Sequence, residues 1–201
     1  ALVCDAGTPC ISDPGYHLIS QAQQLGVKVI PIPGPSALTS LASVAGMPCH
    51  RLLFVGFLSR KSSQLLKDAQ EWASLKASVV AYESPKRLEA SLEALSRLFP
   101  AVRICIGREL TKTYEEIVVF SLLEALEWVR VHPSLKGEIA LVLDFSQVQT
   151  TTGLDKLTVE LQQACQQGIL DPKEVGIFLE KKSLSKKDLY NLVFKLLKVN
   201  S

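Results

Sequence analysis

Four loops in this sequence carry polar residues of the kinds that bind ligands or move protons. They are residues 5–15 (DAGTPCISDPG), 33–37 (PGPSA), 82–87 (YESPKR) and 108–115 (RELTKTYE). Each follows a short apolar stretch that is typical of a buried strand. Open α/β sheets bind their ligands at the ends of strands, so these four loops are the candidate functional segments.

The first two loops each lead from a predicted strand into a predicted helix. Two glycines and two prolines make residues 5–15 a stiff loop. Its backbone amides precede a helix N-terminus, where they could bind polar ligand atoms. A simple turn in which Asp13 caps the helix is the alternative. Ser36 in the second loop poses the same choice, because it could cap the next helix or offer its hydroxyl to a carboxylate.

The third and fourth loops carry most of the charged candidates. Glu83 stands at the end of a strand, where the core does not need it, although Ser84-Pro85 after it is an ordinary helix start. Residues 108–115 are dense in donors and acceptors between two apolar strands. A hairpin connection usually has Gly or Asn and fewer charges, which favours a functional loop. A solvated surface loop is the alternative.

Common catalytic and metal-binding patterns are absent from the sequence. It contains no G-x-S-x-G elbow, Walker loop or G-x-G-x-x-G turn. The five cysteines are scattered without a C-x-x-C pair and the three histidines stand apart from them. This pattern predicts no metal site and no disulfide framework, and it favours a reducing cytoplasm.

Composition adds weaker constraints on the partners. No apolar run approaches the roughly 20 residues of a membrane helix, so no membrane association is predicted. The net charge is only +2. Nucleic-acid-binding proteins are usually more basic, so the charge by itself says little about RNA binding.

Strand and helix patterns alternate along the first 145 residues, which predicts an α/β fold. Strands are predicted at residues 1–4, 27–32, 52–57, 78–82, 102–107, 116–120 and 139–145. Helices are predicted at residues 14–25, 36–46, 85–99 and 122–131, with a further one that places Leu65, Ala69, Trp72 and Ala73 on one face. Residues 146–153 are polar and aperiodic, which is typical of a linker, and only helices are predicted beyond them.

Six motifs taken together resemble one protein family. DAGTPCISDPG, PIPGPSAL, FVGFL, YESPKRL, RELTKTYEE and KGEIALVL occur in this order between the N-terminus and residue 145. They are similar to those of the ribosomal RNA small subunit methyltransferase I family, the 16S rRNA (cytidine 2′-O)-methyltransferase branch of the tetrapyrrole methylase superfamily. The resemblance implies an S-adenosylmethionine-dependent enzyme that methylates a cytidine ribose in 16S rRNA of the small ribosomal subunit.

The resemblance also implies an architecture. The family fold has two α/β domains with the cofactor in the cleft between them, and the protein forms a homodimer. Residues 1–50 would be the remainder of the N-terminal cofactor-binding domain, residues 51–146 the second α/β domain, and residues 147–201 a linker with a helix-turn-helix-like tail. The lysines of that tail are candidate contacts to RNA phosphates.

The family resemblance assigns cofactor contacts to residues of all four polar loops. In the third loop only Tyr82 is included, and not the charged residues after it. The predicted S-adenosylmethionine-binding residues are Ala6, Gly7, Thr8, Ile11, Ser36, Ala37, Tyr82 and Leu110. The family's own N-terminus carries two to three strands and a P-I-G-N type loop that precede the position of Ala1. Because that part forms one wall of the cofactor site, we expect this 201-residue piece to be weakly active or inactive.

Candidate catalytic residues follow from residue type and loop position. Methyl transfer to a ribose hydroxyl needs alignment and removal of a proton. Glu83, Glu109 and Glu115 are candidate bases, whereas Arg108 and Lys112 are candidates to orient the RNA or stabilise its oxygen. Two other functions stay open: carbon methylation of a tetrapyrrole, which uses the same fold and cofactor, and a non-catalytic RNA-binding role.

Overall fold

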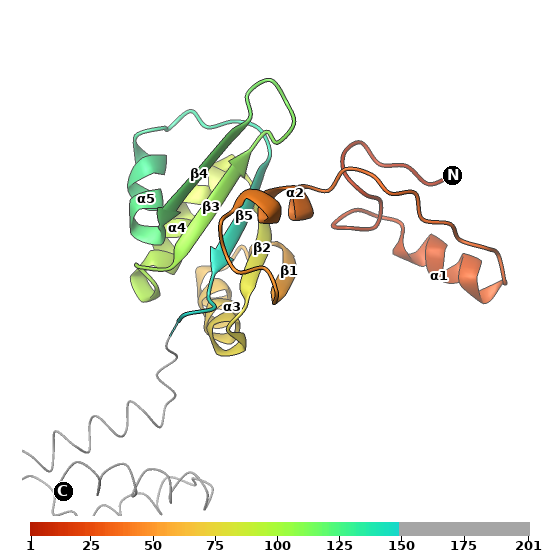
Figure 1. Cartoon of the computed structure of the whole chain (residues 1–201), viewed down its shortest axis with the longest axis horizontal. Coiled ribbons are helices and arrows are strands. Elements are labelled where there is room, and N and C mark those ends of the chain that lie inside the picture. The colour runs from red at the N-terminus through yellow and green to blue at the C-terminus, as the bar shows by residue number, and fades with distance from the viewer. Residues whose placement is uncertain (149–201) are drawn as a thin grey trace, which may run out of the picture. The chain divides into compact units, whose positions relative to one another are not determined.

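A mixed sheet forms the centre of the part of the chain that the structure, a computed structural model, describes, which is residues 1–148. Its strands are β1 (Leu52–Phe57), β2 (Ser78–Glu83), β3 (Arg103–Arg108), β4 (Glu116–Ser121) and β5 (Ile139–Asp144), in the spatial order β1-β2-β5-β3-β4 (Figure 1). Strands β1 and β2 run parallel, while β5 pairs antiparallel with both β2 and β3, and β3 pairs antiparallel with β4. The α/β fold predicted from sequence is confirmed.

Three helices cover one face of this sheet and a fourth packs on the other. Helices α3 (Ser62–Leu75), α4 (Pro85–Leu98) and α5 (Leu122–Arg130) contribute to the larger core cluster, whereas α2 (Ala37–Val44) contributes to the smaller one. Strands β2 and β5 are buried along nearly their whole length because both of their faces are covered. Alternate residues of these strands therefore serve the two clusters.

Along the central strands, alternate apolar side chains belong to two different core clusters, one on each face of the sheet. The larger cluster holds Val79, Ala81, Ile104, Ile106, Ile139, Leu141, Leu143 and Phe145 from the sheet side. The smaller cluster holds Leu41, Ala45, Met47, Val80, Cys105, Ala140 and Val142. Tyr82 and Leu110 pack against the smaller cluster, on the side of α2.

Local sequence signals explain where the helices begin. Ser84 adopts an extended conformation as N-cap of α4 and Pro85 takes its first position. Ser121 and Glu124 form a reciprocal capping box at the start of α5. Among the described residues no helix is long and apolar enough to cross a membrane.

The N-terminal part of the chain differs from the prediction. The predicted strands at residues 1–4 and 27–32 are not formed, because a strand needs a hydrogen-bonded neighbour and neither segment has one in the described region. Helix α1 (Tyr16–Gln24) begins after Gly15 instead of after Asp13, since the φ of +138° at Gly15 interrupts helical geometry. It buries none of its residues.

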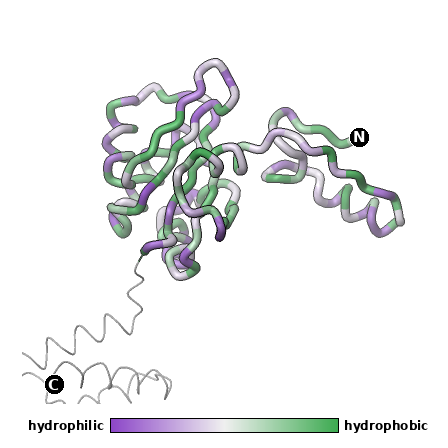
Figure 2. The backbone as a smooth tube through the Cα atoms, in the orientation of Figure 1, coloured by the Kyte–Doolittle hydropathy of each residue, from purple (hydrophilic) through white to green (hydrophobic). Residues whose placement is uncertain are grey.

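Apolar side chains in this first segment are therefore exposed. Figure 2 shows hydrophobic stretches along the extended backbone before α2 as well as in the sheet. The exposed ones are Val3, Ile11, Tyr16, Leu18, Leu25, Val27, Val29, Ile30 and Ile32.

The predicted domain boundaries remain predictions. All the strands described lie between Leu52 and Asp144, within the predicted second domain, yet α2 precedes residue 50 and packs on β2 and β5 of that sheet. The predicted linker beyond residue 148, the helical tail and its lysines lie outside the described residues.

Candidate functional site

The first polar loop, residues 5–15, contains several residues with left-handed backbone. Cys10 and Ser12 have φ values of 69° and 59°, and Gly7 has 75°. Residues with a Cβ rarely adopt such angles, and when they do they often belong to ligand-binding turns. Ala6, Gly7 and Ile11 are exposed at the surface of this loop, while Thr8 is half-buried.

The first and second polar loops lie against each other. The Thr8 hydroxyl donates a hydrogen bond of 3.1 Å to the carbonyl oxygen of Pro35, 27 residues further along the chain. The same carbonyl lies 4.0 Å from the position that a Cβ would take at Gly7. The structure thus brings Gly7 and Thr8 next to the turn that carries Ser36 and Ala37.

Ser36 occupies the N-cap of α2, but its side chain makes no capping hydrogen bond. Its backbone carbonyl accepts from the amide of Ser40 at 3.0 Å and from the hydroxyl of Thr39 at 3.3 Å. The hydroxyl of Ser36 is consequently available to a ligand, as are first-turn amides of α2 other than that of Leu38, which faces the Tyr82 phenol. Capping alone, the alternative drawn from the sequence, does not explain this serine.

Ala37, Tyr82 and Leu110 come from three separate elements and pack against the same small core cluster. The ring of Tyr82 lies edge-on to Phe54 and Phe57, with centroid distances of 5.2 and 5.7 Å. Burial raises the pKa of Tyr82 above its usual value. These contacts form an apolar wall that is continuous with the N-terminus of α2.

A contact also links the first loop to strand β1. Gly56 lies at an irregularity in the β1–β2 pairing and has a φ of +66°. A Cβ at this position would approach the Ser12 hydroxyl to 3.3 Å. The bulge of β1 therefore lets residues 5–15 come close to the sheet.

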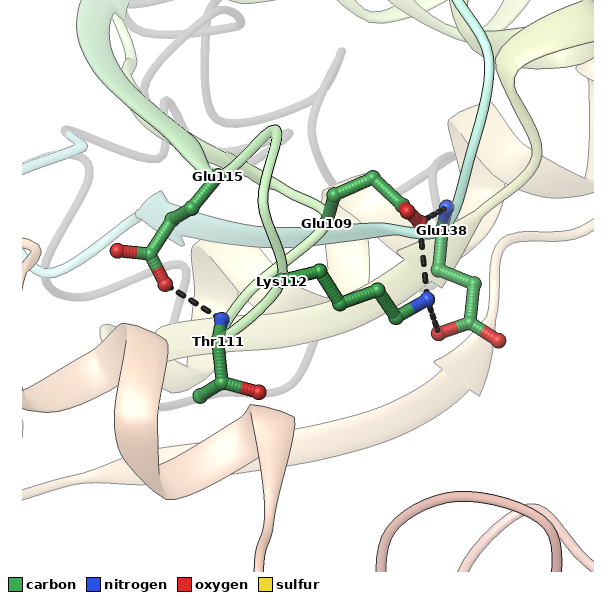
Figure 3. Close-up of polar contacts among 5 residues, drawn as sticks. All are labelled: Glu109, Thr111, Lys112, Glu115 and Glu138. Carbon is green, nitrogen blue, oxygen red and sulfur yellow. Dashed lines mark hydrogen bonds and ion pairs between the residues drawn. The ribbon is translucent and has the colours of Figure 1, made fainter.

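The charged side chains of the fourth loop are engaged by groups of the protein, several of which Figure 3 shows. Lys112 Nζ lies 3.0 Å from a carboxylate oxygen of Glu109 and 3.0 Å from one of Glu138. The Glu115 carboxylate accepts a hydrogen bond from the backbone N–H of Thr111. Arg108 Nε pairs with Glu116 at 3.0 Å.

These contacts set the charge states of the loop. The backbone N–H of Glu138, and then the ammonium of Lys112, hold the pKa of Glu109 below its usual value. Hydrogen bonds to Glu109 and Glu138 raise the pKa of Lys112. A carboxylate with a lowered pKa is a weaker base, so Glu109 is poorly suited to take a proton. Glu115 is exposed and stays the more accessible candidate base of this loop.

Glu83, the third candidate base, lies on the other face of β2 from Tyr82. It is 2% exposed. Its carboxylate accepts from the backbone N–H of Ser84 and from the hydroxyl of Ser91, both at 2.7 Å, and pairs with Arg87 at 3.2 Å. This geometry favours a structural role at the β2–α4 junction, and the catalytic role predicted from its position stays a prediction.

Two residues of this region were missed by sequence reasoning. Glu138 follows Lys112 by 26 residues, and no local pattern links them, although Glu138 lies within the KGEIALVL motif. The sequence pattern places Gly107 only at the end of a strand, yet its lack of a side chain leaves room for Leu41 and Leu110. In the described part of the chain, no three His, Cys, Asp or Glu side chains are grouped as metal ligands would be.

Comparison with known proteins adds the family. Residues 1–126 match the tetrapyrrole (corrin/porphyrin) methylases. Ribosomal RNA small subunit methyltransferase I of Halalkalibacterium halodurans is 42% identical over 144 residues, which cover 72% of this chain and 50% of that protein. The enzyme of the same name from Pasteurella multocida is 33% identical over 192 residues, covering 94% of this chain and 68% of that protein.

Solved structures support the fold alone. The methyltransferase CobJ superposes with a TM-score of 0.51 at 19% identity, covering 69% of this chain and 61% of CobJ. Cobalt precorrin-4 methyltransferase CbiF gives a TM-score of 0.51 at 12% identity. The superposition covers 71% of this chain and 63% of CbiF. The chain spans about half the length of several curated relatives. It belongs to the tetrapyrrole methylase family, in the branch of ribosomal RNA small subunit methyltransferase I.

Proposed function

We propose that this chain forms part of an S-adenosylmethionine-dependent methyltransferase that modifies the 2′-oxygen of a cytidine ribose in 16S rRNA. The observation that carries the proposal is that residues from four of the family-like motifs lie close together in the structure. The Thr8–Pro35 hydrogen bond joins DAGTP to PGPSA, and Ala37 packs with Tyr82 and Leu110 on one core cluster. The names of the curated relatives supply the rRNA substrate.

The residues present fit this cofactor in chemistry. A carboxylate would be held by the free hydroxyl of Ser36 and the first-turn amides of α2. The apolar wall of Ala37, Tyr82 and Leu110 suits a nucleoside. On the other side, the exposed residues Ala6, Gly7 and Ile11 offer backbone groups beside Thr8.

The protein's contribution to the reaction is alignment and proton removal. The cofactor, when bound, supplies an electrophilic methyl group on a sulfonium. Transfer of this methyl group to a ribose hydroxyl would require a residue of the chain to take the hydroxyl proton. We assign the proton acceptor to Glu115, which is exposed and whose carboxylate is held only by the Thr111 N–H, before Glu109, which is ion-paired with Lys112, and Glu83, which is buried. Arg108 is the candidate to orient the RNA.

Partners are proposed on the same basis. The 16S rRNA of the small ribosomal subunit is the proposed substrate, and a second copy of the protein is the proposed partner, as the family resemblance implies. We place the activity in the cytoplasm, where small subunits are found.

Replacing Thr8 tests the proposed site. At the natural length of the protein, Thr8→Trp should fill the space beside Pro35 and abolish S-adenosylmethionine binding and methyl transfer to small subunits. Thr8→Ser, which keeps the hydroxyl that reaches Pro35, should retain most of the activity. Calorimetry and transfer of a labelled methyl group are the measurements. Full turnover of Thr8→Trp would show that this loop is only a turn.

The substrate is tested separately. We expect labelled methyl groups to appear on small subunits and not on uroporphyrinogen. Transfer to the tetrapyrrole instead would establish the alternative reaction of the same family, and cofactor binding without any transfer would favour a non-catalytic RNA-binding protein.

A further inference from the structure

The loop between β3 and β4 holds a backbone conformation that needs support from its surroundings. Glu109 and Thr111 have φ values of 50° and 65°. Residues with a Cβ keep left-handed angles only where surrounding interactions impose them. Leu110 stands between these two residues, so its direction depends directly on both of them.

On its polar side the loop is fastened to the residues that precede β5. The amide of Glu109 donates to the carbonyl of Glu138 at 3.0 Å, and the amide of Glu138 donates back to the Glu109 carboxylate at 2.8 Å. Lys112 Nζ then joins the two carboxylates, at 3.0 Å from each (Figure 3). Gly137, with a φ of +97°, leaves the space that the Glu109 side chain occupies.

On its apolar side the loop packs against β3 at Gly107, where no side chain projects. A Cβ at Gly107 would lie 3.0 Å from a methyl carbon of Leu110 and 2.6 Å from one of Leu41. Leu110 can therefore fold back over β3 only because residue 107 is a glycine. This position brings Leu110 to the cluster that Ala37 and Tyr82 also contact.

We propose that Lys112 is a positioning residue: by bridging Glu109 and Glu138 it fixes the β3–β4 loop so that Leu110 stays in the wall of the cofactor site. The inference rests on the proposed cofactor site. It replaces a contact between Lys112 and RNA with a role inside the protein. It also accounts for two of the charges in this short connection, because Lys112 and Glu109 pair with each other.

The test compares three variants of the protein at its natural length. Lys112→Met removes the bridge, Lys112→Arg retains a cation that can pair with both carboxylates, and Lys136→Met removes an exposed lysine two residues before Glu138 as a matched control. Calorimetry gives the S-adenosylmethionine affinity, and binding to small subunits at several salt concentrations gives the salt slope. Hydrogen exchange of the ligand-free protein reports the order of the loop.

We expect Lys112→Met to weaken cofactor binding by about threefold to fivefold, as befits a half-exposed ion pair, and to speed amide exchange in residues 109–113. Lys112→Arg should keep cofactor affinity and amide exchange close to those of the wild type. Lys136→Met should change neither the affinity nor the exchange. High salt should shrink the difference between wild type and Lys112→Met. The salt slope of small-subunit binding should stay unchanged.

Two results would overturn the proposal. Unchanged cofactor affinity with a smaller salt slope would mean that Lys112 contacts RNA phosphate. Unchanged exchange in the loop would mean that the ion pairs do not order it. If the wild-type protein does not bind S-adenosylmethionine at all, the proposed function fails, while the exchange data still decide whether Lys112 orders the loop.

Discussion

At the scale of single residues, substitution of Glu83 can decide whether its carboxylate has a structural or a catalytic role. Three donors surround it in a buried site, so Glu83→Gln would turn an amide N–H₂ toward at least one of them. We expect a loss of about 1–3 kcal/mol in the free energy of unfolding, typical of an unsatisfied buried polar group. Urea unfolding measures it. The control Glu89→Gln, at an exposed ion pair with Arg130, should change stability by less than about 0.5 kcal/mol.

The same variant also tests the catalytic prediction for Glu83. If the carboxylate of Glu83 is structural, Glu83→Gln should lower the stability of the protein and leave the turnover of the folded fraction largely intact. Normal stability with lost methyl transfer would instead identify Glu83 as the base.

Cys105 gives a prediction about pH. Burial raises the pKa of its thiol from 9.0 to about 11. Because the folded pKa is above the unfolded one, the stabilisation linked to this thiol is complete below about pH 9 and is lost as the pH rises toward 11. At pH 8 we expect alkylation of the exposed Cys49 to run far ahead of Cys105. Mass spectrometry of the labelled peptides distinguishes them, and equal rates would show that the sheet opens readily.

At the scale of elements, the packing of α2 on β3 depends on Gly107. Gly107→Ala would place a methyl group against the buried Leu41 and against Leu110. Overpacking of this kind costs about 1–3 kcal/mol in a rigid core. We expect lower stability together with weaker cofactor binding, because Leu110 is displaced.

A second substitution checks the cause of that loss. Leu41→Val in the Gly107→Ala background removes one methylene from the crowded position and should recover part of the stability. If the double variant is simply the sum of two losses, the glycine matters for backbone conformation and not for space.

At the scale of the whole molecule, the described region divides into a packed part and an exposed part. Residues 37–148 build both core clusters, whereas α1 buries nothing and its neighbours expose their apolar side chains. An exposed apolar surface of this kind binds hydrophobic dyes and is cleaved early by proteases.

Among residues 1–148, limited proteolysis should therefore cut first within residues 1–36 and leave the sheet with its helices intact. Peptide mapping over time gives the order of cleavage. Early cuts inside β2 or β5, the most deeply buried strands, would contradict the packing described here.

Much of this protein could be predicted from short stretches of sequence. Ser84-Pro85 marks the start of α4, the spacing of Leu65, Ala69 and Trp72 predicts the buried face of α3, and apolar runs predict the strands from β1 to β5. These signals are local, since backbone preference, capping and burial on one face act within a few residues. The motif order in addition identified the family, which the comparisons confirm.

The remaining features were decided only by tertiary structure. The insertion of β5 between β2 and β3, the absence of strands at residues 1–4 and 27–32, and the ion pair of Lys112 with Glu138 all depend on partners far away in sequence. A strand exists only when a neighbour accepts its hydrogen bonds, and a carboxylate is free or engaged according to what the fold brings beside it. The sequence alone therefore determined which residue types stand in the loops, while the fold determined that Glu83, Glu109 and Lys112 pair within the protein.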